Sequence, residues 1–313
     1  MRTWRRILLL CIVSWASISV VLAFVAVHPA RRPLPPAAEG AARHMAATLD
    51  SELEDVQVSG IDGTALRAWF VRPRNGNGND VILLHGVGDN RLGMAGYAKF
   101  LLRHGYGVLM PDSRAHGLSG GDVATYGLRE SADISKWMDW LEANQHPSCV
   151  FGLGESMGAA LLLEYLQRER RYCAVVAESP YATFREVAYD RVGQFFGLGP
   201  WVGRVVLRPV VELSFVYVRV RYHANLDLAD PEGAVAATPV PVLLIHGHED
   251  NNIPERHCEL IAERDPAVVF WDVPGAGHTG AYHARPVEFE TRVLGWFTKH
   301  ERGGLQPNIR SIN

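Results

Sequence analysis

Hydrophobic residues along this chain form short continuous runs that alternate with amphipathic segments. The run from Val81 to Leu84 is apolar at every position, which is typical of a strand buried on both faces of a mostly parallel sheet. The pattern repeats, and it predicts further strands at residues 107–110, 150–153, 174–177, 240–245 and 268–273. Helices are predicted at residues 97–104, 128–144, 159–168, 255–263 and 287–299. Strands that alternate with helices indicate a doubly wound α/β sheet.

Two alternating runs precede this pattern, Val56 to Val58 and Leu66 to Val71, and Asp62-Gly63 lies between them. An Asp-Gly pair between such runs is a strong hairpin signal. We therefore expect an antiparallel pair of strands at the edge of the sheet.

The alternation fails between residues 181 and 238, where apolar and aromatic segments carry scattered arginines. An insertion of this size between two strands is typical of a helical cap. Because ligands bind where the strands of such sheets end, we expect the cap to form one wall of a substrate pocket. Extra packing alone would also account for the insertion.

The N-terminal segment has no charged residue from Ile7 to Val27, a length that spans the roughly 30 Å hydrocarbon core of a bilayer as a helix. Residues 1–27 are therefore predicted to be a single-pass membrane anchor. A cleaved signal peptide, cut after Val21-Leu22-Ala23, is the alternative. Arginines at positions 2, 5 and 6 slightly outnumber those at 31 and 32, which favours an extracytoplasmic catalytic domain.

Residues 28–42 are rich in proline and alanine, and this composition predicts a semi-rigid, extended spacer without a core of its own, within a linker at residues 28–50. Such a spacer would hold the domain at 51–301 off the membrane. Residues 302–313 are left as a C-terminal tail.

Composition agrees with one large globular domain, because 48% of the 313 residues are hydrophobic and 21% are charged. A net charge of −3 provides no basic field for nucleic acid, so nucleic acid is not expected as a partner. The four cysteines form no C-x-x-C pair, which argues against a disulfide framework or a zinc knuckle. We expect them to be buried as small apolar residues, and they leave the compartment undecided.

The pattern G-x-S-x-G occurs at residues 154–158, where an apolar run ends and a helix-forming run begins. A sharp strand-to-helix turn of this kind raises a serine hydroxyl above the sheet, and Gly154 and Gly158 provide the two positions that tolerate no side chain. Ser156 is therefore the candidate nucleophile. A glycine-rich turn with an uninvolved serine is the alternative.

A serine nucleophile needs a base, and the base needs a carboxylate that orients it. Candidates follow two later strands, Asp250 after residues 240–245 and His278 after residues 268–273. We expect His278 to be the general base and Asp250 the orienting acid. Glu178, at the end of an earlier strand, is the rival acid. Taken alone, Asp250 would also suit a helix cap, and His278 a surface loop.

Acyl transfer also needs N–H donors directed at the oxygen that becomes negative. His85-Gly86-Val87-Gly88 follows the buried run at 81–84 directly, at the same edge of the sheet. We expect the backbone N–H groups of Val87 and Met157 to form this oxyanion hole.

Across residues 56–299 the chain resembles the α/β-hydrolase superfamily of serine hydrolases. The motifs that carry the resemblance are residues 85–88, 112–120, 154–158, 247–250 and 275–278, in that order. The resemblance, closest to a membrane-anchored branch of esterases and peptidase-like enzymes, implies an eight-stranded mostly parallel sheet and an acyl-enzyme route without metal or organic cofactor. Ala115 departs from the family loop, which more often has glycine, and we expect the turn to absorb it.

The substrate is expected to be a small-molecule ester or acyl compound. Carboxylic ester, thioester, lipid acyl ester and small peptide amide all remain open, because a fold does not fix a substrate. A membrane-associated acyl substrate is one hypothesis, since the predicted cap is rich in aromatic residues and arginines. The residues behind it are Phe195, Phe196, Trp201, Arg204, Arg208, Phe215, Tyr217, Arg219, Arg221 and Tyr222. Aromatic residues that form only the cap's own core would be the plainer explanation.

Two other classes of function are considered as alternatives. His246-x-His248-x-Asp250 resembles the ligand run of metallo-β-lactamase-type hydrolases, although Asn251 stands where that pattern has histidine. A catalytically inactive hydrolase fold, used as a binding protein, is the other.

Overall fold

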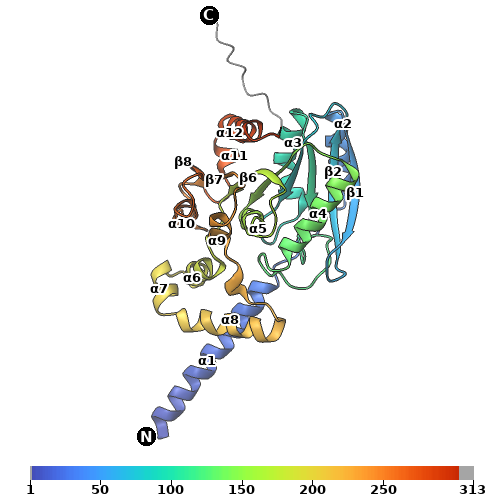
Figure 1. Ribbon diagram of the computed structural model, residues 1–313. Helices are drawn as coiled ribbons and strands as arrows, with labels where there is room; N and C mark the ends of the chain where they lie inside the picture. Colours follow the sequence, from blue (N-terminus) through green and yellow to red (C-terminus); the bar gives the residue numbers. More distant parts are fainter. Residues whose placement is uncertain (1, 303–313) are drawn as a thin grey trace, which may run out of the picture.

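The computed structural model describes residues 2–302, which form a central sheet covered by helices on both faces and a helical layer at one end (Figure 1). The strands are β1 (Ser51–Ser59), β2 (Ala65–Pro73), β3 (Asp80–Leu84), β4 (Gly107–Pro111), β5 (Val150–Glu155), β6 (Tyr172–Glu178), β7 (Val242–Gly247) and β8 (Val269–Val273). Their order is β1-β2-β4-β3-β5-β6-β7-β8. Among the strands of residues 2–302, only the pairs β1·β2 and β2·β4 are antiparallel. The predicted eight-stranded, mostly parallel sheet is confirmed.

Alternate side chains of β3 show why the sheet needs two helical layers. Val81 and Leu83 join the core that includes α2 (Ala38–Thr48), α3 (Ala95–Arg103) and α12 (Pro286–Lys299). Ile82 and Leu84 join the opposite core, with α4 (Glu130–Asn144) and α5 (Met157–Tyr165). Burial of each such side chain contributes about 1.5–3 kcal/mol, which explains the continuously apolar run.

The edge hairpin agrees with its sequence signal. β1 and β2 pair from Ser51 opposite Pro73 to Ser59 opposite Ala65. The turn between them is closed by the Gly60 N–H, which donates to the Thr64 carbonyl at 2.8 Å, and Gly63 takes a φ of 80°.

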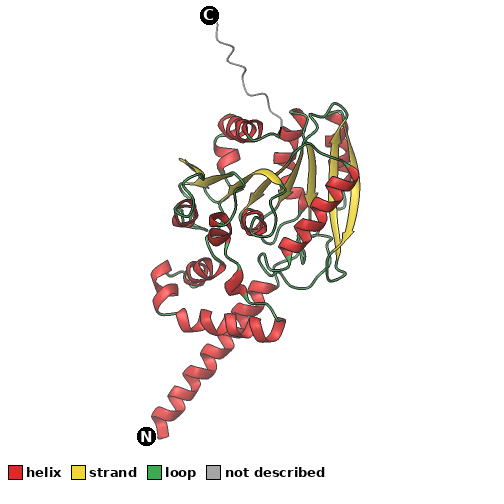
Figure 2. Ribbon diagram, in the orientation of Figure 1, coloured by secondary structure: helices red, strands yellow, loops and turns green. Residues whose placement is uncertain are grey.

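The predicted cap is helical, and Figure 2 shows it as a layer of helices at one end of the sheet. It consists of α6 (Phe184–Phe195), α7 (Pro200–Val205) and α8 (Arg208–Tyr222). The chain returns to the sheet through η2 (Leu226–Leu228) and α9 (Pro231–Ala236). The remaining elements are η1 (Arg91–Met94), α10 (Arg256–Ala262) and α11 (Ala281–Ala284).

The N-terminal helix α1 (Arg2–Val27) is long and apolar enough to cross a membrane. Its first turns project away from the domain, and its last turns lie against α8 (Figure 1). Ser19, Ala23 and Val27 are each at most 2% exposed. They recur every four residues and so share one face of the helix. The apolar segment therefore continues directly into the folded domain.

The expectation of a spacer without a core of its own is wrong for residues 38–48. Residues 38–48 form α2, whose Ala38, Ala42 and Ala46 pack into the core beside Trp69 of β2. Alanines at four-residue spacing give a narrow apolar stripe that the proline-rich composition obscured. The segment before α2 is also held, because Arg31 donates to the Gly121 carbonyl at 2.6 Å.

The cysteine expectation also needs correction. Cys149 and Cys173 are both buried, as expected, but they form a disulfide with a Cα–Cα distance of 5.8 Å. They lie where the neighbouring strands β5 and β6 begin, and the helix between these strands returns the chain to the same edge of the sheet. A separation of 24 residues gives no hint of this proximity. Of the predicted C-terminal tail, residues 303–313 lie outside the described residues.

Candidate active site

Ser156 occupies the sharp turn between β5 and α5, with φ 52° and ψ −117°. A Cβ on Gly158 would lie 2.1 Å from the Leu84 carbonyl oxygen, and one on Gly154 would lie 2.6 Å from the backbone of Gly158. Only glycine fits at either position. The Ser156 N–H donates to the Glu178 carbonyl at 2.8 Å, which ties the strained turn to β6.

His278 and Asp250 converge on this serine from the loops after β8 and β7. The Nε2 of His278 lies 2.9 Å from the Ser156 hydroxyl oxygen, and its Nδ1 lies 2.7 Å from Oδ2 of Asp250. The other oxygen of Asp250 accepts the N–H groups of Asn252 and Ile253 at 2.8 and 2.9 Å. Burial alone would raise the pKa of Asp250, but the hydrogen bonds from His278 and these amides hold it below its usual value. Asp250 is therefore a fixed carboxylate beside the imidazole.

Glu178, the rival acid, is directed elsewhere. One carboxyl oxygen accepts the Tyr97 hydroxyl at 2.8 Å, and the other accepts the Ala281 N–H at 2.9 Å. Burial raises its pKa, against the effect of these two hydrogen bonds. The geometry favours Asp250 as the partner of His278.

The predicted oxyanion loop follows β3, beside the serine. The Nε2 of buried His85 accepts the Ser113 N–H at 3.1 Å, so its Nδ1 carries the proton and donates to the Gly86 carbonyl at 2.8 Å. Burial lowers the pKa of His85, which keeps this ring neutral. Gly88 takes a φ of 72°, which suits glycine.

Val87 and Met157, the expected oxyanion donors, line the same cavity as Ser156. Val87 is half exposed there, and Met157 is the first residue of α5. The N–H groups at the start of a helix have no partner within the helix. The Met157 N–H therefore has no acceptor within α5.

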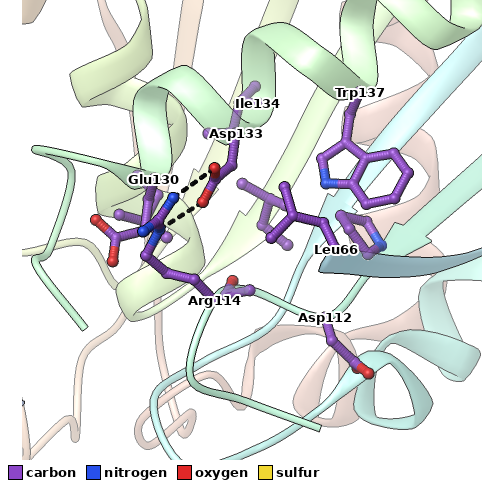
Figure 3. A pocket seen from close by; sticks show the side chains of 11 residues that line it. Leu66, Asp112, Arg114, Glu130, Asp133, Ile134 and Trp137 are labelled. Carbon is purple, nitrogen blue, oxygen red and sulfur yellow. Dashed lines mark hydrogen bonds and ion pairs between the residues drawn. The ribbon is translucent and has the colours of Figure 1, made fainter. Parts of the chain in front are cut away.

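The loop at residues 112–120 is structural. Asp112 is fully buried and accepts N–H groups of Arg91 and Leu118 at 2.8 and 2.7 Å. Arg114 donates two hydrogen bonds to the carboxylate of Asp133 in α4, drawn as dashed lines in Figure 3. The cavity in that view measures about 10 Å³, enough for about one water molecule and no substrate. Ala115 takes a φ of 60°, so the turn accepts alanine in a conformation that favours glycine.

A much larger cavity of about 560 Å³ opens at Ser156, within the size range of small-molecule sites. Its walls are mostly apolar, and the cap helices α6 and α8 contribute a large share of them. Phe195 and Phe215 belong to it, whereas Arg204 ion-pairs with Glu186 and buried Asp190. Residues of α1 complete the wall, a contribution that the sequence analysis missed. An apolar helix gives the same signal whether it only anchors a domain or also lines its pocket.

The structure does not bring His246, His248 and Asp250 together as a set of three metal ligands. His246 is buried and bonds the Ile253 carbonyl at 3.0 Å, while exposed His248 lies 2.9 Å from Asp272. Within residues 2–302, the grouping with metal-binding spacing is His248, Glu255 and Asp272, at the surface. It includes neither His246 nor Asp250.

Glu155, inside the G-x-S-x-G motif, is a second feature that the sequence analysis missed. Its carboxyl group lies 3.4 Å from the Tyr97 hydroxyl, which also bonds Glu178. Burial, together with the nearby charge of Glu178, raises the pKa of Glu155 to about 7. The motif gave no signal for this, because its second position accepts many residues.

The sheet order and the serine at the sharp turn after β5 are both in agreement with the sequence comparison. The model of the Alpha/beta hydrolase family matches residues 81–292, more than half of the chain. The chain belongs to the alpha/beta hydrolase family.

Three similar proteins illustrate the family. The esterase Pf2001 of Pyrococcus furiosus superposes with a TM-score of 0.69 at 26% identity, covering 88% of this chain and 99% of that one. Monoacylglycerol lipase of Mycolicibacterium smegmatis is 26% identical over 70% of this chain and 88% of that protein. The uncharacterized protein YqkD of Bacillus subtilis is 28% identical over 64% of this chain, which spans 65% of that protein's length.

Proposed function

We propose that this protein is a serine hydrolase that cleaves carboxylic esters through an acyl-enzyme intermediate. The observation that carries the proposal is the hydrogen-bonded series Ser156, His278 and Asp250 at the end of an apolar cavity. Thioesters, lipid acyl esters and small peptide amides react by the same steps, so they belong to the same proposal.

In the proposed mechanism, Nε2 of His278 takes the hydroxyl proton as the Ser156 oxygen attacks the ester carbonyl carbon. The carbonyl oxygen becomes negative and accepts the N–H groups of Val87 and Met157. His278 then gives its proton to the departing alcohol as the carbon–oxygen bond breaks. Asp250 keeps Nδ1–H oriented throughout, and a water molecule repeats the sequence to release the acid.

Two further features support an ester substrate. The cavity offers a wide apolar surface and few polar groups, which suits an acyl or alkyl chain. Two of the similar proteins are described as an esterase and a monoacylglycerol lipase. An inactive binding protein would have no need to keep the strained turn at Ser156 and its alignment with His278.

We also propose that α1 anchors the chain in a membrane, with the catalytic domain on the extracytoplasmic side. The Cys149–Cys173 disulfide supports this side, because disulfides persist in oxidising compartments. Cleavage after Ala23 would cut a helix whose Ala23 and Val27 are buried, which favours a retained anchor. A test is thiol alkylation of the denatured, membrane-extracted protein, in which these two cysteines should react only after reduction.

The decisive test of the function compares wild type with Ser156→Ala on p-nitrophenyl acetate and on a fluorophosphonate probe. Wild type should turn over the ester and become labelled, and Ser156→Ala should lose both while keeping the same thermal midpoint. Turnover above about a hundredth of wild type in the purified variant would refute the assignment. Loss of wild-type activity on treatment with a strong chelator would instead indicate a metal-dependent hydrolase.

A further inference from the structure

The last turns of α1 are built into the catalytic domain. The Ser214 hydroxyl of α8 donates to the Ser19 carbonyl of α1 at 2.9 Å. At the end of the helix, the Ala124 N–H donates to the Val27 carbonyl at 2.9 Å, and the Tyr126 hydroxyl bonds the Ala26 carbonyl. Small residues at four-residue spacing, such as Ser19 and Ala23, let two helices approach closely, as they do between membrane helices.

A neighbouring face of the same helix lines the cavity that opens at Ser156. Val21, Leu22, Val25 and Ala26 contribute to the wall, in two rows at four-residue spacing. Side chains of α6 and α8 also contribute to the wall, including Val187, Val211, Phe215 and Val218. Val21 and Val25 are also 60% and 58% exposed, so the cavity extends to the outer surface beside α1.

We propose that the last two turns of α1 are a substrate-binding element, and that the substrate is a single-chain lipid ester whose acyl chain lies between α1, α6 and α8. This inference rests on the proposed ester hydrolysis at Ser156. It adds that the apolar N-terminal helix selects the substrate as well as anchoring the protein.

The position of the cavity along α1 explains how such a substrate reaches the serine. The apolar run at residues 7–27 matches the thickness of a bilayer's hydrocarbon core, and α1 contacts α8 of the cap. The buried residues Ser19, Ala23 and Val27 belong to the last nine residues of this run. When α1 spans the bilayer, these residues lie in the leaflet nearest to the catalytic domain. The cavity then opens at the depth of the acyl chains, and the chain of a lipid ester enters beside Val21 and Val25.

The outer surface of the cap fits that position. Large apolar side chains are exposed on α6, α7 and α8, where a water-facing surface would carry polar ones. They include Phe195 at 71%, Trp201 at 66%, Val216 at 57% and Val220 at 71% exposure. This surface is continuous with α1, because α8 packs directly on that helix.

The test changes the cavity wall without touching the serine. Full-length protein in detergent micelles is assayed on p-nitrophenyl acetate and p-nitrophenyl decanoate, as wild type, Leu22→Trp and Val20→Trp. The larger side chain at position 22 should exclude about two methylene groups, lowering the decanoate-to-acetate ratio of kcat/KM about tenfold. Val20, exposed on α1 and outside the cavity wall, is the matched control and should leave that ratio unchanged.

An unchanged ratio in Leu22→Trp, or an equal fall in Val20→Trp, would overturn the inference. Loss of fluorophosphonate labelling at Ser156 would indicate that Leu22→Trp does not fold. In that case Leu22→Ala tests the role of position 22 by enlarging the cavity. Its larger cavity should move the preferred acyl length upward by at least two carbons, and an unmoved preference would overturn the inference. The proposed function fails separately, if wild type neither hydrolyses the esters nor becomes labelled at Ser156.

Discussion

At the scale of single residues, the two candidate acids near His278 differ in their hydrogen-bond partners. Asp250 bonds Nδ1 of His278, whereas Glu178 bonds Tyr97 and the Ala281 N–H. Glu178 ends β6 and Asp250 follows β7 at the same edge of the sheet, so spacing along the sequence alone did not choose between them. The choice depends on the loop after β7, which turns the Asp250 side chain toward the imidazole.

We expect Asp250→Asn to lower kcat roughly 10³–10⁴-fold, because an amide favours the wrong tautomer of His278. Glu178→Gln is the matched change and should cost less than about tenfold, since its carboxyl group does not contact the imidazole. Steady-state kinetics on a short ester measure both. Full activity in Asp250→Asn with loss in Glu178→Gln would reverse the assignment.

The raised pKa of Glu155 leads to a prediction about how ester hydrolysis depends on pH. Its pKa of about 7 means that it is neutral in acid and becomes negative as pH rises through 7. Glu178 and Asp89 lie near enough to oppose that charge, and the Tyr97 hydroxyl favours it. A carboxylate beside the nucleophile turn would disfavour the negative oxygen of the transition state.

The ratio of kcat/KM for Glu155→Gln over wild type should therefore rise between pH 6 and 8.5, by about tenfold. Ester hydrolysis across this range measures the ratio, with thermal midpoints checked at each pH. A ratio that stays flat would show that the Glu155 charge does not reach the reacting oxygen.

At the scale of elements, continuous apolar runs predicted the parallel strands to within about two residues, because burial on both faces dictates composition. The candidate site residues also followed, since each lies where a strand ends. What the sequence could not show depends on tertiary contact. The Cys149–Cys173 disulfide needs the return of the chain through α5, and α2 is recognisable only once its alanines meet the sheet. The role of α1 depends on its partner α8.

Helix α5 contains a buried acid that links folding to pH. Glu164 is 6% exposed and accepts the Asp230 N–H at 2.8 Å. Burial raises its pKa from 4.5 to about 8, so the folded protein keeps it protonated where the unfolded chain does not. The folded state binds more protons in that window, and stability is lost as pH rises from about 4.5 to 8.

We expect Glu164→Gln to remove this loss, since its amide oxygen still accepts the Asp230 N–H. The free energy of unfolding relative to wild type should increase with pH across that window, by at most about 1.4 kcal/mol per pH unit. Urea unfolding at several pH values measures it. Glu259→Gln, an exposed glutamate on α10, is the control, and equal pH dependence in both variants would contradict the prediction.

At the scale of the whole molecule, an apolar N-terminal helix, a helical cap and the catalytic sheet form one continuous body. Ser19, Ala23 and Val27 are buried, the Ser19 carbonyl accepts a hydrogen bond from Ser214 of α8, and Arg31 and α2 continue the contact toward the sheet. A tether that only fixes location needs none of these contacts. The stability of the domain should therefore depend on the second half of α1 and not on the first.

Two truncations separate these halves. Removal of residues 1–28 takes Ala23 and Val27 out of the core that they share with apolar side chains of α8, at a cost of several kcal/mol, so the thermal midpoint should fall by about 10 °C. Removal of residues 1–14 deletes turns whose described side chains are exposed and should leave the midpoint unchanged in the same detergent. Differential scanning fluorimetry measures both. Equal midpoints would mean that α1 is a separable anchor, because its packing on α8 would then contribute nothing to folding.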